Sequence, residues 1–63
     1  MDSPNLSICI VNYQAADYLR NCLNSILASP PQGDYEIIVV DNGSTDGSCE
    51  MLKSEFPGVT LIQ

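Results

Sequence analysis

The chain has 63 residues, enough for one small structural unit of marginal stability, because a chain this short buries only about 60% of its unfolded surface. Two basic and eight acidic residues give a formal net charge of -6, which would repel the phosphate backbone of a nucleic acid, so we expect no nucleic-acid partner. The longest apolar runs, residues 8–11 and 37–40, are far shorter than the ~20 residues of a transmembrane helix, so we expect no membrane span.

The first half of the chain is predicted to hold one strand and one helix. Residues 1–5 should form a frayed lead-in. Residues 6–11 are too continuously apolar for a strand with one wet face, which predicts a parallel strand covered on both sides. Over residues 15–28 the apolar side chains fall in pairs four positions apart, which predicts a helix that ends at two prolines. Its expected apolar stripe comprises Tyr18, Leu19, Cys22, Leu23, Ile26 and Leu27.

The second half repeats this order. Residues 36–41 contain a four-residue β-branched and apolar block and are predicted to form a second strand. A turn-rich segment follows, then a helix from residue 46 or 47 to 55, and a third strand begins at residues 59–62. The order β-α-β-α-β predicts an α/β fold with an open parallel sheet, half of a Rossmann-like unit. Such a half should expose a sheet edge and an apolar patch, so we expect self-association or loose folding.

The cysteines point to a reducing compartment. Cys9, Cys22 and Cys49 are an odd number without Cys-x-x-Cys spacing, and the chain has no histidine to complete a zinc site. The first residues also lack the basic segment of a secretory signal. We therefore expect three buried or half-buried reduced thiols in a cytoplasmic protein.

Ligands of open α/β sheets bind beyond the carboxyl ends of the strands. The segment after the first strand, Asn-Tyr-Gln-Ala-Ala at residues 12–16, contains no glycine, which excludes the glycine fingerprint of dinucleotide-binding proteins. The chain also has no Gly-Lys-Ser or Gly-Lys-Thr and therefore no P-loop. A phosphate group would have to be handled by something else, most simply a metal ion.

Asp41 ends the second predicted strand and begins the turn Asp-Asn-Gly-Ser-Thr-Asp-Gly. A carboxylate held there can accept hydrogen bonds from a nucleobase imide or a ribose hydroxyl, whereas the alternative is that Asp41 only caps the turn. We favour binding for Asp41. For Asp46 we favour capping, because it stands where a helix N-cap is expected.

From about residue 6 to residue 63 the chain resembles the amino-terminal region of family 2 glycosyltransferases. The most specific part is Val-Val-Asp-Asn-Gly-Ser-Thr-Asp-Gly at residues 39–47. Val-Asn-Tyr-Gln at residues 11–14 is a weaker match, because the family more often has asparagine at the position of Gln14. The Asp-Asn-Gly-Ser form is similar to that of rhamnosyltransferase-like bacterial enzymes. The resemblance implies a GT-A fold, of which residues 1–63 would be a single partial domain, and sugar transfer from a nucleoside-diphosphate sugar to an acceptor hydroxyl.

The resemblance also implies nucleotide-binding residues for a UDP- or dTDP-linked donor. Val11, Asn12 and Tyr13 would line the pocket for the base and ribose. Asp41 would hold the base, and Asn42 and Ser44 would shape the turn beneath it. The six residues are Val11, Asn12, Tyr13, Asp41, Asn42 and Ser44.

Family members bind Mg²⁺ or Mn²⁺ through an acidic Asp-x-Asp motif further along the chain, and inverting members use an Asp or Glu base beyond that motif. No catalytic or metal-binding residue is therefore expected within these 63 residues, and this segment alone should not transfer sugar. The intact enzyme is expected in the cytoplasm, with peripheral membrane attachment as an alternative. A complete small α/β binding or interaction module stays open; a receiver-like signalling domain is disfavoured because the first strand does not end in an acidic pair.

Overall fold

The computed structural model describes residues 5–63. Within them the elements follow one another as β1 (Leu6–Asn12), α1 (Ala16–Ala28), β2 (Tyr35–Asp41), α2 (Ser48–Glu55) and β3 (Thr60–Ile62). The predicted order of elements is confirmed, with bounds that differ by one or two residues. Of the expected frayed lead-in, only Asn5 is described, and its backbone N–H donates to the carbonyl oxygen of Asp34 at 3.0 Å. Asn5 is therefore bonded to the loop between α1 and β2.

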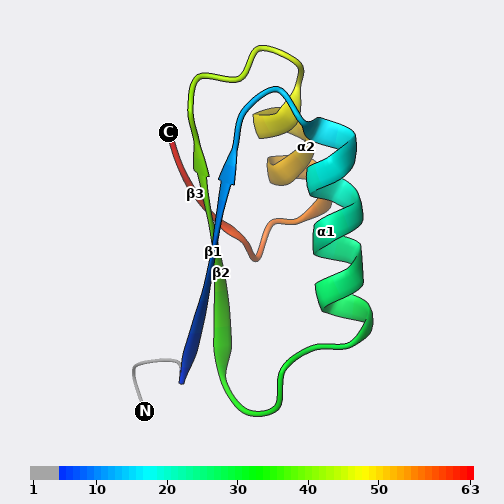
Figure 1. The fold of residues 1–63 in the computed structure, drawn as a ribbon, viewed down its shortest axis with the longest axis vertical. Helices are drawn as coiled ribbons and strands as arrows, with labels where there is room; N and C mark the ends of the chain where they lie inside the picture. The colour runs from blue at the N-terminus through cyan, green and yellow to red at the C-terminus, as the bar shows by residue number, and fades with distance from the viewer. Residues whose placement is uncertain (1–4) are drawn as a thin grey trace.

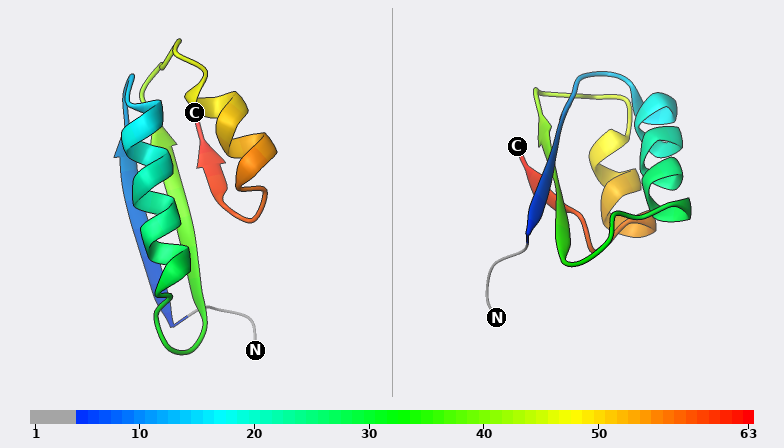
Figure 2. Two further views of the ribbon diagram at one scale, coloured as in Figure 1. Left: turned by 90° about the vertical axis from the view of Figure 1, so that its right-hand side faces the viewer. Right: turned by 60° about the horizontal axis from the view of Figure 1, so that its bottom comes forward.

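The described strands form one parallel sheet in the order β1-β2-β3. The register pairs Leu6 with Tyr35 and Asn12 with Asp41, so β1 and β2 begin and end at the same level. Both helices lie on the same side of this sheet (Figures 1 and 2). The predicted α/β fold with an open parallel sheet is confirmed. The loops that leave β1 and β2 both run over the carboxyl edge of the sheet, at the top of Figure 1.

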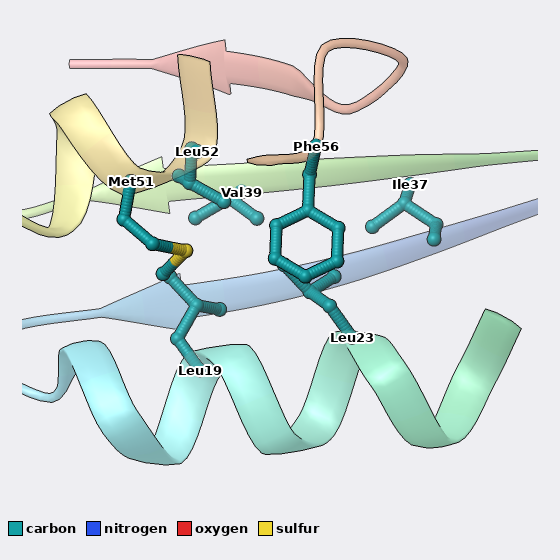
Figure 3. Packing of buried hydrophobic residues seen from close by; sticks show 7 residues of the cluster. All are labelled: Leu19, Leu23, Ile37, Val39, Met51, Leu52 and Phe56. Atoms are coloured by element: carbon teal, nitrogen blue, oxygen red, sulfur yellow. The ribbon is translucent and has the colours of Figure 1, made fainter. Parts of the chain in front are cut away.

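The core lies between the sheet and the two helices. Leu23 and Val39 are 0% exposed, and Phe56, the residue after α2, lies between α1 and the sheet with its ring beside Leu23 (Figure 3). Because side chains of a strand alternate between faces, Ile37 and Val39 point into this core. The cluster consists of Leu19, Leu23, Ile37, Val39, Met51, Leu52 and Phe56.

The apolar stripe of α1 is narrower than the sequence predicts. Leu19 and Leu23 are buried, but Tyr18 is 82% exposed, Leu27 is 48% exposed, and Cys22 is exposed. Each exposed residue directly precedes or follows a more buried one. Because adjacent residues are rotated by about 100° around the helix axis, when one of them faces the core its neighbour points away from it. The prediction that all six residues face the core is therefore wrong for these three.

Among the described residues, no helix is long and apolar enough to cross a bilayer.

The strand β1 is covered on one face only. Ile8 and Ile10 are half-buried towards the helices, whereas Cys9 is exposed and Val11 is 72% exposed on the opposite face. Within residues 5–63 nothing covers that opposite face, so the prediction of a strand covered on both sides is wrong for this structure, and the predicted exposed apolar face is confirmed. It carries Cys9, Val11, Ile38, Val40 and Ile62. Self-association of the chain stays a prediction.

The cysteines differ in exposure although all are free thiols: Cys9 and Cys22 are exposed and Cys49 is buried. The predicted burial is thus confirmed for Cys49 and wrong for the other two, which lie on the uncovered sheet face and on the solvent side of α1. We expect a thiol reagent to modify two cysteines rapidly in the native chain and the third only after denaturant is added. Mass spectrometry of the modified peptides measures this, and rapid modification of Cys49 in the native chain would contradict its position.

Candidate functional site

Asn12 and Asp41 meet at the carboxyl ends of β1 and β2. They are register partners, and each lies two positions after a residue that points towards the core, Ile10 and Val39 respectively, so both side chains lie on the helix side of the sheet. Asn12 is 3% exposed and Asp41 is 6% exposed. The Nδ2 of Asn12 donates to Oδ1 of Asp41 at 2.9 Å. A buried side-chain hydrogen bond therefore joins the two strand ends.

Ser44 completes this arrangement from the turn after β2. Its backbone N–H donates to Oδ2 of Asp41 at 2.8 Å, and its Oγ accepts a bond from Nδ2 of Asn12 at 3.2 Å. Gly43 has φ +86°, a left-handed conformation that glycine adopts without strain, and this lets the turn fold back towards Asp41. Asn12, Asp41 and Ser44 are called the strand-end network below.

The strand-end network holds Asp41 in its charged form. Hydrogen bonds from Asn12 and Ser44 lower the pKa of Asp41 to about 2, because they favour the carboxylate over the neutral acid. Every buried side-chain nitrogen or oxygen within residues 5–63 has a hydrogen-bond partner. The sequence predicts that this carboxylate faces an open crevice. In the structure Asp41 is instead 6% exposed and lies on the same side of the sheet as Val39.

The other three residues of the predicted site are exposed. Val11 is 72% exposed on the uncovered face of the sheet, Tyr13 is 61% exposed, and Asn42 is exposed at the start of the turn. The backbone N–H of Asn42 donates to the carbonyl oxygen of Asn12 at 3.0 Å, so the turn begins beside the end of β1. The six predicted residues thus divide into a buried or half-buried network and an exposed set beside it.

Asp46 connects the first residues of both helices. Its Oδ2 accepts the backbone N–H of Ala16, the first residue of α1, at 3.1 Å, and its Oδ1 accepts that of Ser48, the first residue of α2, at 3.1 Å. A negative charge is favourable at both helix starts, and the hydrogen bond from the Ser48 hydroxyl lowers the pKa of Asp46. The N-cap position predicted for Asp46 is occupied by Gly47, and Asp46, one residue before it, accepts the N–H of Ser48 instead. The contact of Asp46 with α1 could not be read from the sequence, because Ala16 lies 30 positions away.

Two hollows lie at different distances from the carboxyl edge of the sheet. One of about 490 Å³ lies towards the amino end of β2 and is lined largely by apolar groups, among them Leu27, Tyr35 and Phe56. Another of about 470 Å³ lies at the start of α1 and is lined by residues that include Tyr18 and Asp46. Because open α/β sheets bind ligands beyond the carboxyl ends of their strands, we place the candidate site at the strand-end network. Within residues 5–63 no group of three His, Cys, Asp or Glu side chains could hold a metal ion.

Comparison with known proteins gives consistent matches. Residues 7–63 match the sequence model of glycosyl transferase family 2. Glycosyltransferase AglE of Haloferax volcanii is 39% identical over 51 residues, which cover 79% of this chain and 17% of the relative. The poly(ribitol-phosphate) beta-glucosyltransferase of Bacillus spizizenii is 39% identical over 62 residues, which cover 92% of this chain and 10% of the relative.

A third relative, the uncharacterized glycosyltransferase YibD of Escherichia coli K12, is 38% identical over 66 residues, covering 98% of this chain and 19% of the relative. The chain therefore spans between 10% and 19% of the length of these three proteins. No solved structure matches the chain significantly.

Proposed function

The chain belongs to glycosyl transferase family 2, and from this premise we propose that it binds the nucleotide of a nucleoside-diphosphate sugar donor. The observation that carries the proposal is the strand-end network, which holds the loops after β1 and β2 together at the ligand-binding edge of the sheet. Transfer of the sugar to an acceptor hydroxyl by the whole protein belongs to the same proposal. That residues 1–63 alone do not transfer sugar stays a prediction.

We assign direct contact with the nucleotide to the exposed set. The ring of Tyr13 offers a flat apolar surface on which a base can stack, and Val11 adds apolar contact nearby. The carboxamide of Asn42 carries both an acceptor and two donors. It can pair with the imide edge of uracil or thymine, where an N–H stands between two carbonyl groups. This complementarity supports a UDP- or dTDP-linked donor.

The strand-end network has a different part in the proposal. Asp41 was expected to hold the base directly, but the residue is 6% exposed and both of its carboxylate oxygens accept bonds within the chain. These contacts support an indirect role, in which Asp41 fixes the turn that presents Asn42. Asn12 and Ser44 serve the same purpose, because each contacts Asp41 and neither is fully open to solvent.

A divalent cation, Mg²⁺ or Mn²⁺, is also part of the proposal, since it would offset the charge of the donor diphosphate. The residues that the structure describes do not fit such an ion, because no three suitable side chains lie together among them. No step of binding is therefore assigned to a metal here. The cytoplasmic location and the rhamnosyltransferase-like subtype stay predictions, supported by the free thiols and by the Asp-Asn-Gly-Ser sequence, respectively.

Nucleotide binding is tested by titrating the 63-residue chain with UDP and dTDP while NMR chemical shifts are recorded, with ADP for comparison. We expect the signals of Tyr13 and Asn42 to shift with UDP or dTDP, and less with ADP. Loss of base stacking in Tyr13→Ala should remove about 1–3 kcal/mol of binding free energy, roughly a 5- to 150-fold loss in affinity.

The matched control is Tyr18→Ala, because Tyr18 is also exposed but lines the hollow at the start of α1. Its removal should leave the affinity unchanged. If Tyr18→Ala weakened binding and Tyr13→Ala did not, the nucleotide would lie in the hollow and the assigned contacts would be wrong. Absence of any shift with UDP or dTDP would refute nucleotide binding by this chain.

A further inference from the structure

The connection between β1 and α1 contains a residue in an unfavourable backbone conformation. Gln14 has φ +49°, and it is the one non-glycine residue with positive φ among those that the structure describes. The left-handed region favours glycine and, to a lesser degree, asparagine and aspartate, because a side chain there crowds the following carbonyl oxygen. Glutamine has no such preference, so other interactions must hold Gln14 in place.

The side chain of Gln14 bridges to the loop between β2 and α2. Its Oε1 accepts the backbone N–H of Thr45 at 2.7 Å, and its Nε2 donates to the hydroxyl oxygen of Thr45 at 3.0 Å. The backbone N–H of Gln14 donates to Oγ of Ser44 at 2.9 Å. Both bonding groups of the carboxamide are therefore used on one partner residue, 31 positions along the chain.

We infer that Gln14 is a positioning residue of the proposed nucleotide site, which fixes the direction in which Tyr13 presents its ring. Tyr13 stands between Asn12, held in the strand-end network, and Gln14, held by Ser44 and Thr45. Because both neighbours are anchored, the backbone of Tyr13 has little freedom, although its side chain is 61% exposed. Gln14 itself does not touch the nucleotide. The inference rests on the proposed function.

The length of the side chain is the reason for glutamine at this position. An asparagine would suit the left-handed backbone better, but its carboxamide is one methylene group closer to the main chain. It could not keep both contacts with Thr45 without moving one loop towards the other. The strained backbone of Gln14 is thus offset by two hydrogen bonds between the loops.

The test compares four variants of the 63-residue chain, using UDP as the probe. Gln14→Ala keeps the backbone strain and removes the bridge, whereas Gln14→Gly removes both. Gln14→Glu keeps the length and can accept bonds from both the N–H and the hydroxyl of Thr45. Gln32→Ala removes an exposed glutamine from the loop before β2 and serves as the control.

Loss of the bridge should weaken UDP binding by roughly 5- to 10-fold in both Gln14→Ala and Gln14→Gly, the effect of about one hydrogen bond. Gln14→Glu should restore most of the affinity, and Gln32→Ala should bind like the wild type. If Gln14→Ala bound UDP as tightly as the wild type, the inference would be wrong. It would also be wrong if Gln14→Gly bound normally, because backbone strain and not the bridge would then explain the alanine variant.

A second measurement does not depend on the nucleotide. Relaxation of the Tyr13 backbone amide, measured by NMR in the free chain, should show more motion in Gln14→Ala than in the wild type or in Gln14→Glu. A purely structural role would instead lower the unfolding temperature without a change specific to Tyr13. If wild-type chain failed to bind UDP, the proposed function would fail, and the relaxation of Tyr13 would still decide the inference: equal order in Gln14→Ala and the wild type overturns it.

Discussion

Replacing Leu23 with alanine should remove a large part of the stability of the chain. Leu23 is 0% exposed and points from α1 towards Phe56 in the core (Figure 3). Truncation of such a buried leucine costs about 2–5 kcal/mol, because the contacts are lost and a cavity is left. A 63-residue unit has roughly 3–9 kcal/mol in total, at about 0.05–0.15 kcal/mol per residue. Urea unfolding followed by circular dichroism should therefore show a much lower midpoint or a largely unfolded chain.

The neighbouring residue provides a matched control. Cys22 is on the same helix, one position away, but is exposed to solvent. Cys22→Ala should change the unfolding free energy by no more than about 0.5 kcal/mol, as is usual for surface substitutions. Equal losses for the two variants would mean that α1 packs through a wider face than the structure shows. That result would restore the six-residue stripe predicted from the sequence.

The elements were predictable because each carries a strong local signal. Residues 37–40 form a continuous β-branched block between turn-forming segments, and β2 lies there. The pairing of apolar residues four apart gave α1 within one residue. The apolar runs alone did not predict which face of the sheet is covered, whereas the small number of elements did predict an exposed apolar patch. A continuous apolar run is typical of a strand buried on both sides, and the described residues place helices on only one.

The meeting of the two strand ends was predictable from the sequence, but the direction of their side chains was not. The ends of two adjacent parallel strands meet at one edge, so the proximity of the residues after β1 and β2 follows from the topology. Which side chain faces solvent depends on strand alternation, and an error of one residue reverses it. The predicted first strand ended at Val11, whereas β1 extends to Asn12. Asn12 and Asp41 therefore both end on the helix side, where they bond to each other.

The contacts between the loop after β1 and the loop after β2 could be identified only from the structure. Ser44 and Asn12 are 32 positions apart, and Gln14 and Thr45 are 31 positions apart. No local pattern relates such residues, because their contact depends on the φ angles of Gly43 and Gln14. In the sequence, Gln14 differed only in that related enzymes more often have asparagine at this position. The longer side chain of glutamine, which bonds to Thr45 in the other loop, gives a physical reason for the difference.

Asp41→Asn should weaken both the fold and the binding of a uridine or thymidine diphosphate donor. In the wild type, two donors point at the carboxylate: Nδ2 of Asn12 at Oδ1 and the N–H of Ser44 at Oδ2. An asparagine keeps the shape but has one acceptor oxygen and one NH₂ group, so one of the two donors then faces a donor. A lost hydrogen bond to a charged group costs about 1.5–3 kcal/mol. This cost lowers the unfolding free energy, and as far as the turn that carries Asn42 is displaced, it also lowers the donor affinity, by up to roughly 150-fold.

Calorimetric titration with UDP or dTDP measures the affinity, and Asp34→Asn is the control, because it makes the same chemical change at an exposed site at the other end of β2. The control should bind and unfold like the wild type. If Asp41→Asn bound the nucleotide as tightly as the wild type, Asp41 would be a turn residue without influence on binding. The assignment of the strand-end network to the nucleotide site would then fail.

The pH dependence of stability separates the charge of Asp41 from its shape. Hydrogen bonds from Asn12 and Ser44 lower its pKa from 3.8 to about 2 in the folded chain. Because the unfolded chain takes up the proton more readily, this contribution to stability is fully present above about pH 4 and is lost as the pH falls towards 2. The gap in unfolding free energy between the wild type and Asp41→Asn should therefore be constant near neutral pH and shrink on acidification. Urea unfolding of both proteins between pH 7 and pH 2 measures the gap, and a gap that did not shrink in acid would show that the charge of Asp41 adds nothing to the network.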